Sequence, residues 1–200
     1  MHTSITKEEL EELPLVKFTG EIIVVEDARH FNTVVNDLKR QKVIGFDTET
    51  KPSFKKGQRH EVALMQLATI DKAYLIRLNK TGLNGELLKL MSAPDVLKAG
   101  VGIRDDLRAL KRLRDFEPAG FVEVQDLAQE AGLENISLKK LAALVMNVRV
   151  SKRQRLSNWE SDTLTESQMN YAATDAWAAL LIYEGLNKKF PELNIKTVNG

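Results

Sequence analysis

The chain of 200 residues is long enough for one domain with a sizeable core, and 43% hydrophobic with 28% charged residues is ordinary for a globular protein. The absence of cysteine excludes disulfides and thiolate zinc sites, and three scattered histidines give no support for a Ser/His triad. A net charge of +1 leaves any polyanion affinity to local basic clusters, and neither an apolar span nor a secretory signal is found, so we expect a cytoplasmic protein without a membrane partner.

The first half of the chain predicts one short helix, then a strand, a helix and three further strands. Thr6 and Glu9 form a capping box for the first helix. Residues 21–25 are β-branched and predict a strand, after which Asp27 caps a helix with apolar residues at helical spacing. A polar, basic loop is expected over 51–60. The remaining strands follow one another and favour an antiparallel meander; they are expected at 43–49, 62–68 and 73–78.

The second half alternates between helices and strands. Asp126 is expected to cap one helix, and Ser137 another. A meander followed by this alternation predicts an α/β fold, with a mixed central sheet, antiparallel first and parallel later, flanked by helices. No Pro/Gly-rich linker divides the chain, so we expect a single domain over residues 1–200. Strands are expected at 96–101 and 121–124, and helices at 85–91, 105–114, 138–146 and 166–189.

Two acids on one predicted strand are the first candidate functional residues. Asp47 and Glu49 are two positions apart, so on a strand their side chains share a face. Placing two acids on an otherwise apolar strand is costly unless something pairs with them. The alternative is that Asp47 begins a loop and that water solvates both acids.

Two further places carry acids. Asp105 and Asp106 follow a predicted strand; a helix N-cap would account for one, and the other could face inward. Tyr171 and Asp175 are four apart and share a face of the last helix, although a core tyrosine and a surface acid would fit the same pattern. If these acids converge with Asp47, their repulsion implies bound divalent metal, and metal held only by oxygen implies phosphate chemistry.

Together these segments resemble the three motifs of the DEDD superfamily of 3′→5′ exonucleases. The motifs are Phe46-Asp47-Thr48-Glu49-Thr50, Gly102-Ile103-Arg104-Asp105-Asp106 and Tyr171-Ala172-Ala173-Thr174-Asp175-Ala176. Stretches over 61–67, 98–103 and 156–159 are also similar to ribonuclease D and to the Werner-syndrome exonuclease domain, so the resemblance spans a core of about residues 20–190. Tyrosine four positions before the last aspartate is typical of the tyrosine subclass.

The resemblance implies a ribonuclease-H-like fold and hydrolysis with two divalent cations, Mg²⁺ or Mn²⁺. It implies that Asp47 bridges both ions and that Glu49 binds one ion and touches the terminal 3′-hydroxyl. Asp175 would bind the ion on the nucleophile side, and Asp106, which matches the motif better than Asp105, would act largely through water. Tyr171 would hold the attacking water. The four metal ligands and Tyr171 are therefore the predicted catalytic residues.

Two basic clusters are candidates for substrate binding. The loop over 51–60 carries Phe54 and the cations Lys55, Lys56 and Arg59, which suits a single strand, although a solvated loop would have the same composition. The second cluster precedes Trp159, for which we expect a packing role; it contains Arg149, Lys152, Arg153 and Arg155.

The sequence thus predicts a metal-dependent 3′→5′ exonuclease that releases nucleoside 5′-monophosphates from a single-stranded or recessed 3′ end. The Val101-Gly102-Ile103 form of the second motif favours DNA over RNA. The alternatives are RNA 3′-end trimming of the ribonuclease D type and an inactive relative that binds nucleic acid. Since no helicase or polymerase segment is found in the sequence, such an enzyme is a possible partner.

Overall fold

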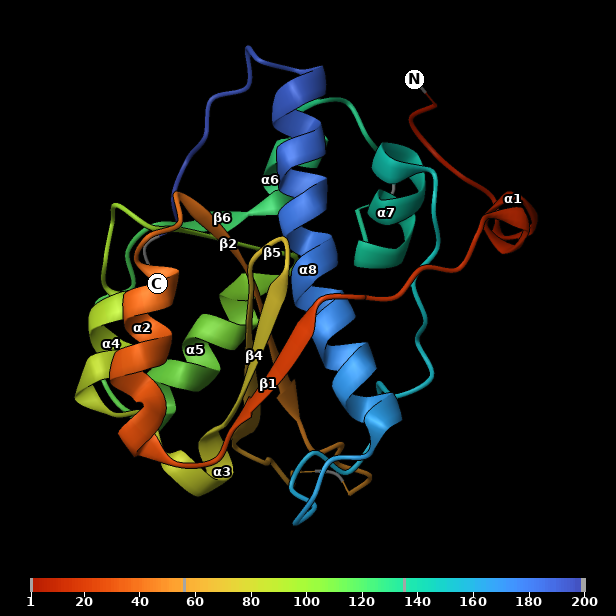
Figure 1. Ribbon diagram of the computed structural model, residues 1–200. Helices are drawn as coiled ribbons and strands as arrows, with labels where there is room; N and C mark the ends of the chain where they lie inside the picture. The colour runs from red at the N-terminus through yellow and green to blue at the C-terminus, as the bar shows by residue number, and fades with distance from the viewer. Residues whose placement is uncertain (1, 56, 135, 199–200) are drawn as a thin grey trace.

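The computed structural model describes residues 2–55, 57–134 and 136–198, and its centre is a six-stranded mixed sheet (Figure 1). The strand order is β1-β4-β3-β2-β5-β6. The strands are β1 (Glu21–Val25), β2 (Val43–Thr50), β3 (Val62–Ala68), β4 (Lys72–Arg77), β5 (Leu97–Gly100) and β6 (Phe121–Glu123).

The predicted mixed α/β architecture is confirmed. β2, β3 and β4 form the expected antiparallel meander, and β5 and β6 then add to β2 in parallel. The sequence does not reveal the place of β1, which pairs in parallel with β4 at the edge of the sheet. Central strands are buried on both faces, which explains why β3 is apolar at all positions but Gln66 and why every one of its residues is buried.

Helices cover both faces of the sheet, as Figure 1 shows. The long helix α8 (Glu166–Lys189) crosses one face above β2 and β3, and α6 (Val124–Glu130) and α7 (Leu138–Met146) pack beside it. The other face is covered by α2 (Phe31–Leu38), α4 (Gly85–Met91) and α5 (Ile103–Leu113), which bury a core around Phe46 and Phe121. The short elements are α1 (Lys7–Glu12), a 3₁₀ turn η1 (Ala28–His30) and α3 (Leu78–Thr81).

Several helix starts follow from capping chemistry. Thr6 closes the expected capping box of α1 with Glu9, and Thr165 closes a second box at the start of α8 with Gln168. Among the described residues, no helix has both the length and the apolar character that crossing a membrane would need.

Two predicted caps are wrong. The N-cap of α6 is Glu123, whose carboxylate accepts a hydrogen bond from the Gln125 backbone, and Asp126 instead lies in the first turn. The N-cap of α5 is Gly102, with a φ of 81°, so Asp105 and Asp106 lie in the first turn of that helix. Each helix begins earlier than expected because the neighbouring backbone turns sharply directly after the strand.

Candidate active site

Asp47 and Glu49 extend from the sheet face that α8 covers. They lie two positions apart on β2, and successive side chains of a strand point to opposite faces, so both carboxylates lie on one face. Glu49 is only 9% exposed and Asp47 is half-buried. The strand conformation therefore agrees with the predicted shared face and not with a solvated loop.

Gly45 allows α8 to approach β2 closely enough to complete the site. A Cβ at Gly45 would lie 1.9 Å from the backbone oxygen of Ala176, so only glycine fits beneath the helix there. Ala176 directly follows Asp175, and Asp175 and Tyr171 are both buried on this stretch of α8. The contact at Gly45 thus fixes the height of Asp175 above the strand that carries Asp47.

Three carboxylates converge at this point. Asp47, Glu49 and Asp175 each offer an oxygen atom, and these atoms lie within 4.8 Å of one another. Tyr171 lines the same cleft as these three acids. Convergence of acids from β2 and α8 is the condition under which the sequence implied bound divalent metal, and it creates a set of oxygen donors of the kind that Mg²⁺ and Mn²⁺ prefer.

Asp106 and Asp105 lie differently although they are neighbours. The Thr48 hydroxyl donates a hydrogen bond of 2.5 Å to the half-buried Asp106 carboxylate. Asp105 is exposed and pairs with Arg108 one turn later on α5. Asp106 therefore faces inward toward β2, in line with the choice of Asp106 over Asp105.

Burial raises the pKa of each acid in the site, and repulsion by neighbouring carboxylates adds to the rise for Asp47, Glu49 and Asp106. Desolvation is the largest cause for every one of them. It raises the pKa of Glu49 to about 9, that of Asp175 to about 7 and that of Asp106 to about 6, and it also raises that of Asp47. Asp106, Asp175 and Glu49 add to the pKa of Asp47 by charge repulsion. Such a cluster is unstable as four anions and gains stability from a cation.

Glu123 is a supporting residue that the sequence analysis did not identify. Its carboxylate is 1% exposed and accepts hydrogen bonds of 2.8 Å from the backbone N–H groups of Gly102 and Ile103. It also accepts one from Gln125. One buried acid on β6 therefore caps both α5 and α6 and fixes the helix turn that carries Asp106. The only sequence signal for this role of Glu123 is an acid at the end of a short apolar strand.

The carboxylates line a cleft of about 370 Å³, whose opposite wall carries basic residues. Lys152 and Arg155 line it, and their charges lower the pKa of Asp175 and Glu49, respectively, against the effect of burial. Other walls come from the first residues of α7 and from Val150 and Ser151. Two of the predicted substrate-binding cations thus face the acids directly.

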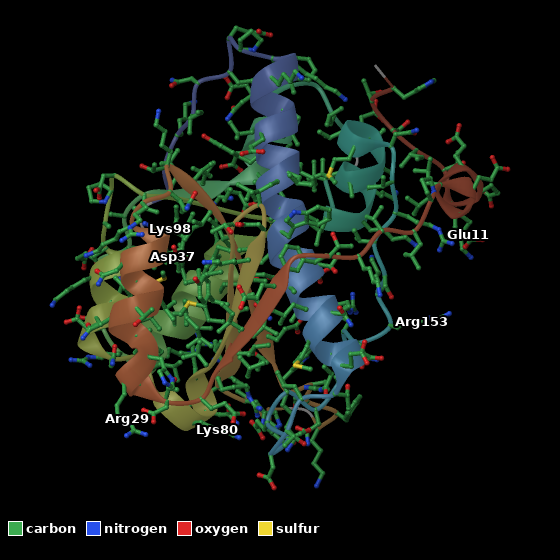
Figure 2. All side chains as sticks on the ribbon, viewed as in Figure 1. Glu11, Arg29, Asp37, Lys80, Lys98 and Arg153 are labelled. Atoms are coloured by element: carbon green, nitrogen blue, oxygen red, sulfur yellow. The ribbon has the colours of Figure 1, made fainter. Side chains whose placement is uncertain are left out.

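The other predicted cations lie elsewhere. Arg153 is exposed at the edge of the molecule beside the N-terminal half of α8, where it lines a second groove that also reaches Tyr171 and Asp175 (Figure 2). Lys55 and Arg59 are exposed on the loop after β2 and are not among the described residues that line the cleft. Lys56 lies outside the described residues.

The segment that carries Lys152 and Arg155 is anchored at its C-terminal end. Trp159 is fully buried, with its ring 6.0 Å from that of Tyr171, which agrees with the packing role expected for it. Glu160 pairs with Lys51 and His60, so it ties this segment to the loop after β2. On the far side, the fully buried Arg77 donates to the Ser161 carbonyl. These contacts hold the basic wall against the sheet.

Comparison with known proteins shows the family of the chain. A family model for 3′–5′ exonucleases matches residues 22–191. The chain belongs to the 3′–5′ exonuclease family. The predicted membership of the DEDD superfamily and the ribonuclease-H-like fold are thereby confirmed, and the chain carries a 3′–5′ exonuclease domain of a hydrolase family.

Individual relatives agree with the family assignment. The chain is 36% identical over 184 residues to the bifunctional 3′-5′ exonuclease/ATP-dependent helicase WRN of Mus musculus, which covers 87% of this chain and 13% of that protein. The Nibbler EXO domain of Aedes aegypti matches 88% of this chain and 91% of its own, with a TM-score of 0.77 and 26% identity. Escherichia coli RNase D matches 86% and 46%, with a TM-score of 0.76; at 19% identity, this shows the fold.

Proposed function

We propose that this 3′–5′ exonuclease hydrolyses nucleic acid with two divalent cations, releasing nucleoside 5′-monophosphates, and that it prefers DNA to RNA. The observation that carries the proposal is the convergence of Asp47, Glu49 and Asp175 within 4.8 Å. Five residues are assigned to the catalytic site: Asp47, Glu49, Asp106, Tyr171 and Asp175.

The residues present fit divalent cations. The donor set is made of carboxylate oxygens, and burial with mutual repulsion makes these groups poor isolated anions. Asp47, Glu49 and Asp175 would hold the ions, with Asp106 acting largely through water. When bound, the cations supply positive charge that activates the attacking water and stabilises the leaving oxygen.

Tyr171 has the properties of an orienting donor. Burial raises the pKa of its hydroxyl above the ordinary value, so the group stays protonated at neutral pH and cannot serve as a base. Its side chain lines the same cleft as Asp47, Glu49 and Asp175. Tyr171 therefore orients the attacking water, and Glu49 is assigned the contact with the terminal 3′-hydroxyl.

The substrate assigned to the site is a single-stranded or recessed 3′ end. Lys152 and Arg155 in the cleft supply charge for the phosphates nearest the site, and Arg153, Lys55, Lys56 and Arg59 are assigned to nucleotides further away. The Val101-Gly102-Ile103 form of the second motif supports DNA. The chain spans 13% of the length of the mouse relative, whose name joins an exonuclease with an ATP-dependent helicase, and a helicase or polymerase partner is part of the proposal.

RNA trimming is the second candidate. A neighbour of the same fold, Escherichia coli RNase D, is described as an exoribonuclease involved in structured RNA processing. An inactive nucleic-acid-binding relative is the third, and the presence of all five site residues argues against it.

One experiment separates these candidates. Single-stranded DNA and RNA of one sequence, labelled at the 5′ end, are incubated with the protein and Mg²⁺, Mn²⁺ or EDTA, and products are resolved by length. We expect a ladder that shortens from the 3′ end with either cation, runs faster on DNA and is abolished by EDTA. Faster shortening of RNA would assign the activity to the ribonuclease D type, and equal products in EDTA would refute metal dependence.

A further inference from the structure

Gln66 is a buried amide without a hydrogen-bond partner in the described part of the chain. It lies in the middle of β3 and is 0% exposed. Neither its side-chain nitrogen nor its side-chain oxygen is hydrogen-bonded. Leaving a buried amide unpaired destabilises a fold, and leucine would fill the same space without that cost. A glutamine here therefore needs a reason other than packing.

The register of the sheet places Gln66 beside the acids. β3 runs antiparallel to β2, and Gln66 is directly opposite Asp47. Side chains opposite each other in an antiparallel pair share a face, with Cβ atoms about 4.5–5.5 Å apart. On its other side, Gln66 is opposite Leu75 of β4. Of the two residues directly opposite Gln66, Asp47 is therefore the polar one.

The same sheet face carries apolar residues and two further charged groups. Its apolar part is the buried cluster that contains Leu75 and two alanines of α8. Glu49 on β2 and the fully buried Arg77 on β4 lie on this face at positions diagonal to Gln66. Asp47 is the polar residue directly opposite Gln66. Because the amide is neutral, it adds no charge to a cluster that already holds too much negative charge.

We propose that Gln66 is a positioning residue: when a divalent cation is bound, its side-chain amide donates a hydrogen bond to the Asp47 carboxylate and sets the orientation of that carboxylate toward the ion. This inference rests on the proposed metal dependence of the site. A carboxylate ligand oriented by a hydrogen bond holds its ion more tightly, and loss of such a partner commonly reduces metal affinity about 10–100-fold. In the metal-free chain the amide stays unpaired and destabilises the fold. This loss of stability accompanies a site that is ready to bind the ion.

The test compares Gln66→Leu and Gln66→Met with Met65→Leu. The two Gln66 variants keep the volume and remove the donor. Met65 is equally buried on β3, but its side chain joins the core on the opposite face, so Met65→Leu controls for disturbance of the strand. Mn²⁺ binding is measured by isothermal titration calorimetry without nucleic acid, and thermal unfolding is followed in EDTA.

We expect both Gln66 variants to bind Mn²⁺ about 10–100-fold more weakly than wild type, with Met65→Leu unchanged. In EDTA, Gln66→Leu should unfold at a higher temperature than wild type, because an unpaired buried amide has been removed. A residue that only packs would give the reverse: a lower unfolding temperature with unaltered affinity. Mn²⁺ affinity within about twofold of wild type in both Gln66 variants overturns the proposal.

The failure of this inference is distinguishable from failure of the proposed function. Wild-type protein that binds Mn²⁺ in a Gln66-dependent manner but leaves labelled DNA and RNA intact would support the positioning role and refute the proposed hydrolysis. Wild-type protein that shortens its substrate, with Gln66 variants of normal Mn²⁺ affinity, would do the opposite. In active variants, excess Mn²⁺ should restore kcat while KM for the strand stays unchanged.

Discussion

The perturbed acids of the site make the stability of the metal-free chain depend on pH. Burial and neighbouring carboxylates raise the pKa of Glu49 to about 9, and burial raises that of Asp175 to about 7. In an unfolded chain both values are about 4. The folded chain therefore binds more protons than the unfolded one, and its stability is full below about pH 4 and is lost as the pH rises through the folded values.

The expected result is an unfolding temperature in EDTA that falls steadily from about pH 5 to about pH 9. Scanning calorimetry at fixed ionic strength measures it. Asp47→Asn removes one repelling charge and should flatten the fall, and excess Mn²⁺ should reverse it. An unfolding temperature that rises with pH in EDTA would contradict the assigned shifts.

The Tyr171 hydroxyl is assigned an orienting role that a single substitution isolates. Tyr171→Phe keeps the ring that lies near that of Trp159 and removes only the hydroxyl. We expect kcat to fall about 100-fold, because the attacking water loses its orienting donor. Mn²⁺ affinity, measured by calorimetry, should stay within about twofold. A parallel loss of Mn²⁺ binding would show that the tyrosine supports the ligands instead.

The face on which a side chain lies was predictable where the periodicity of its own strand or helix determines it. Strand alternation placed Asp47 and Glu49 together, and helical spacing placed Tyr171 with Asp175. Glu123 and Gln66 were not predictable in the same way, since their roles depend on contacts across the sheet with residues about twenty positions away. The catalytic roles of the four site carboxylates and of Tyr171 stay predictions until the substitutions are made.

At the scale of whole elements, the contact between α8 and β2 decides the geometry of the site. Gly45→Ala would place a methyl group 1.9 Å from the Ala176 backbone oxygen, and backbone cannot yield as a flexible side chain does. We expect the free energy of unfolding to fall by about 1–3 kcal/mol and hydrolysis to fall by at least about tenfold, because Asp175 moves away from Asp47.

Chemical denaturation and the labelled-strand assay measure the two effects. Gly85→Ala is the matched control, since a Cβ at Gly85 meets nothing within 4 Å. It should leave both quantities near wild type. If Gly45→Ala leaves stability and hydrolysis as close to wild type as Gly85→Ala does, the contact between Gly45 and Ala176 does not determine the position of Asp175.

The double cap at Glu123 is the second element-scale prediction. Glu123→Ala leaves the buried N–H groups of Gly102 and Ile103 without their acceptor and should lower the free energy of unfolding by about 3 kcal/mol. Asp126→Ala removes an exposed carboxylate in the first turn of α6 and should lower the free energy of unfolding far less. Chemical denaturation compares them, and equal costs would argue against the double cap.

The sequence predicted which segments form helices and which form strands better than it predicted the order of the strands in the sheet. The long apolar runs and capping boxes fixed most strands and helices, and the meander followed from their succession. The partner of β1 was not predictable, because pairing in parallel with β4 requires contacts across about fifty residues of chain. The single-domain organisation over residues 1–200 likewise stays a prediction.

At the scale of the whole molecule, a net charge of +1 means that affinity for nucleic acid depends on where the cations lie. Lys152 and Arg155 lie in the cleft with the carboxylates. Lys55 and Arg59 lie on the exposed loop after β2, which Glu160 ties to the cleft segment through Lys51. A strand whose 3′ end reaches the carboxylates therefore meets the cleft pair first and the loop pair only if it extends further.

Two double variants separate these surfaces. Lys152→Ala with Arg155→Ala should raise KM for strands of any length and reduce the salt dependence of binding by about two phosphate contacts. Lys55→Ala with Arg59→Ala should raise KM only for longer strands and leave kcat unchanged. Steady-state kinetics on DNA of increasing length, with binding titrated across salt concentrations, measures both. If the loop pair changes nothing at any length while the cleft pair does, the strand passes along the cleft alone and the loop after β2 is a solvated surface.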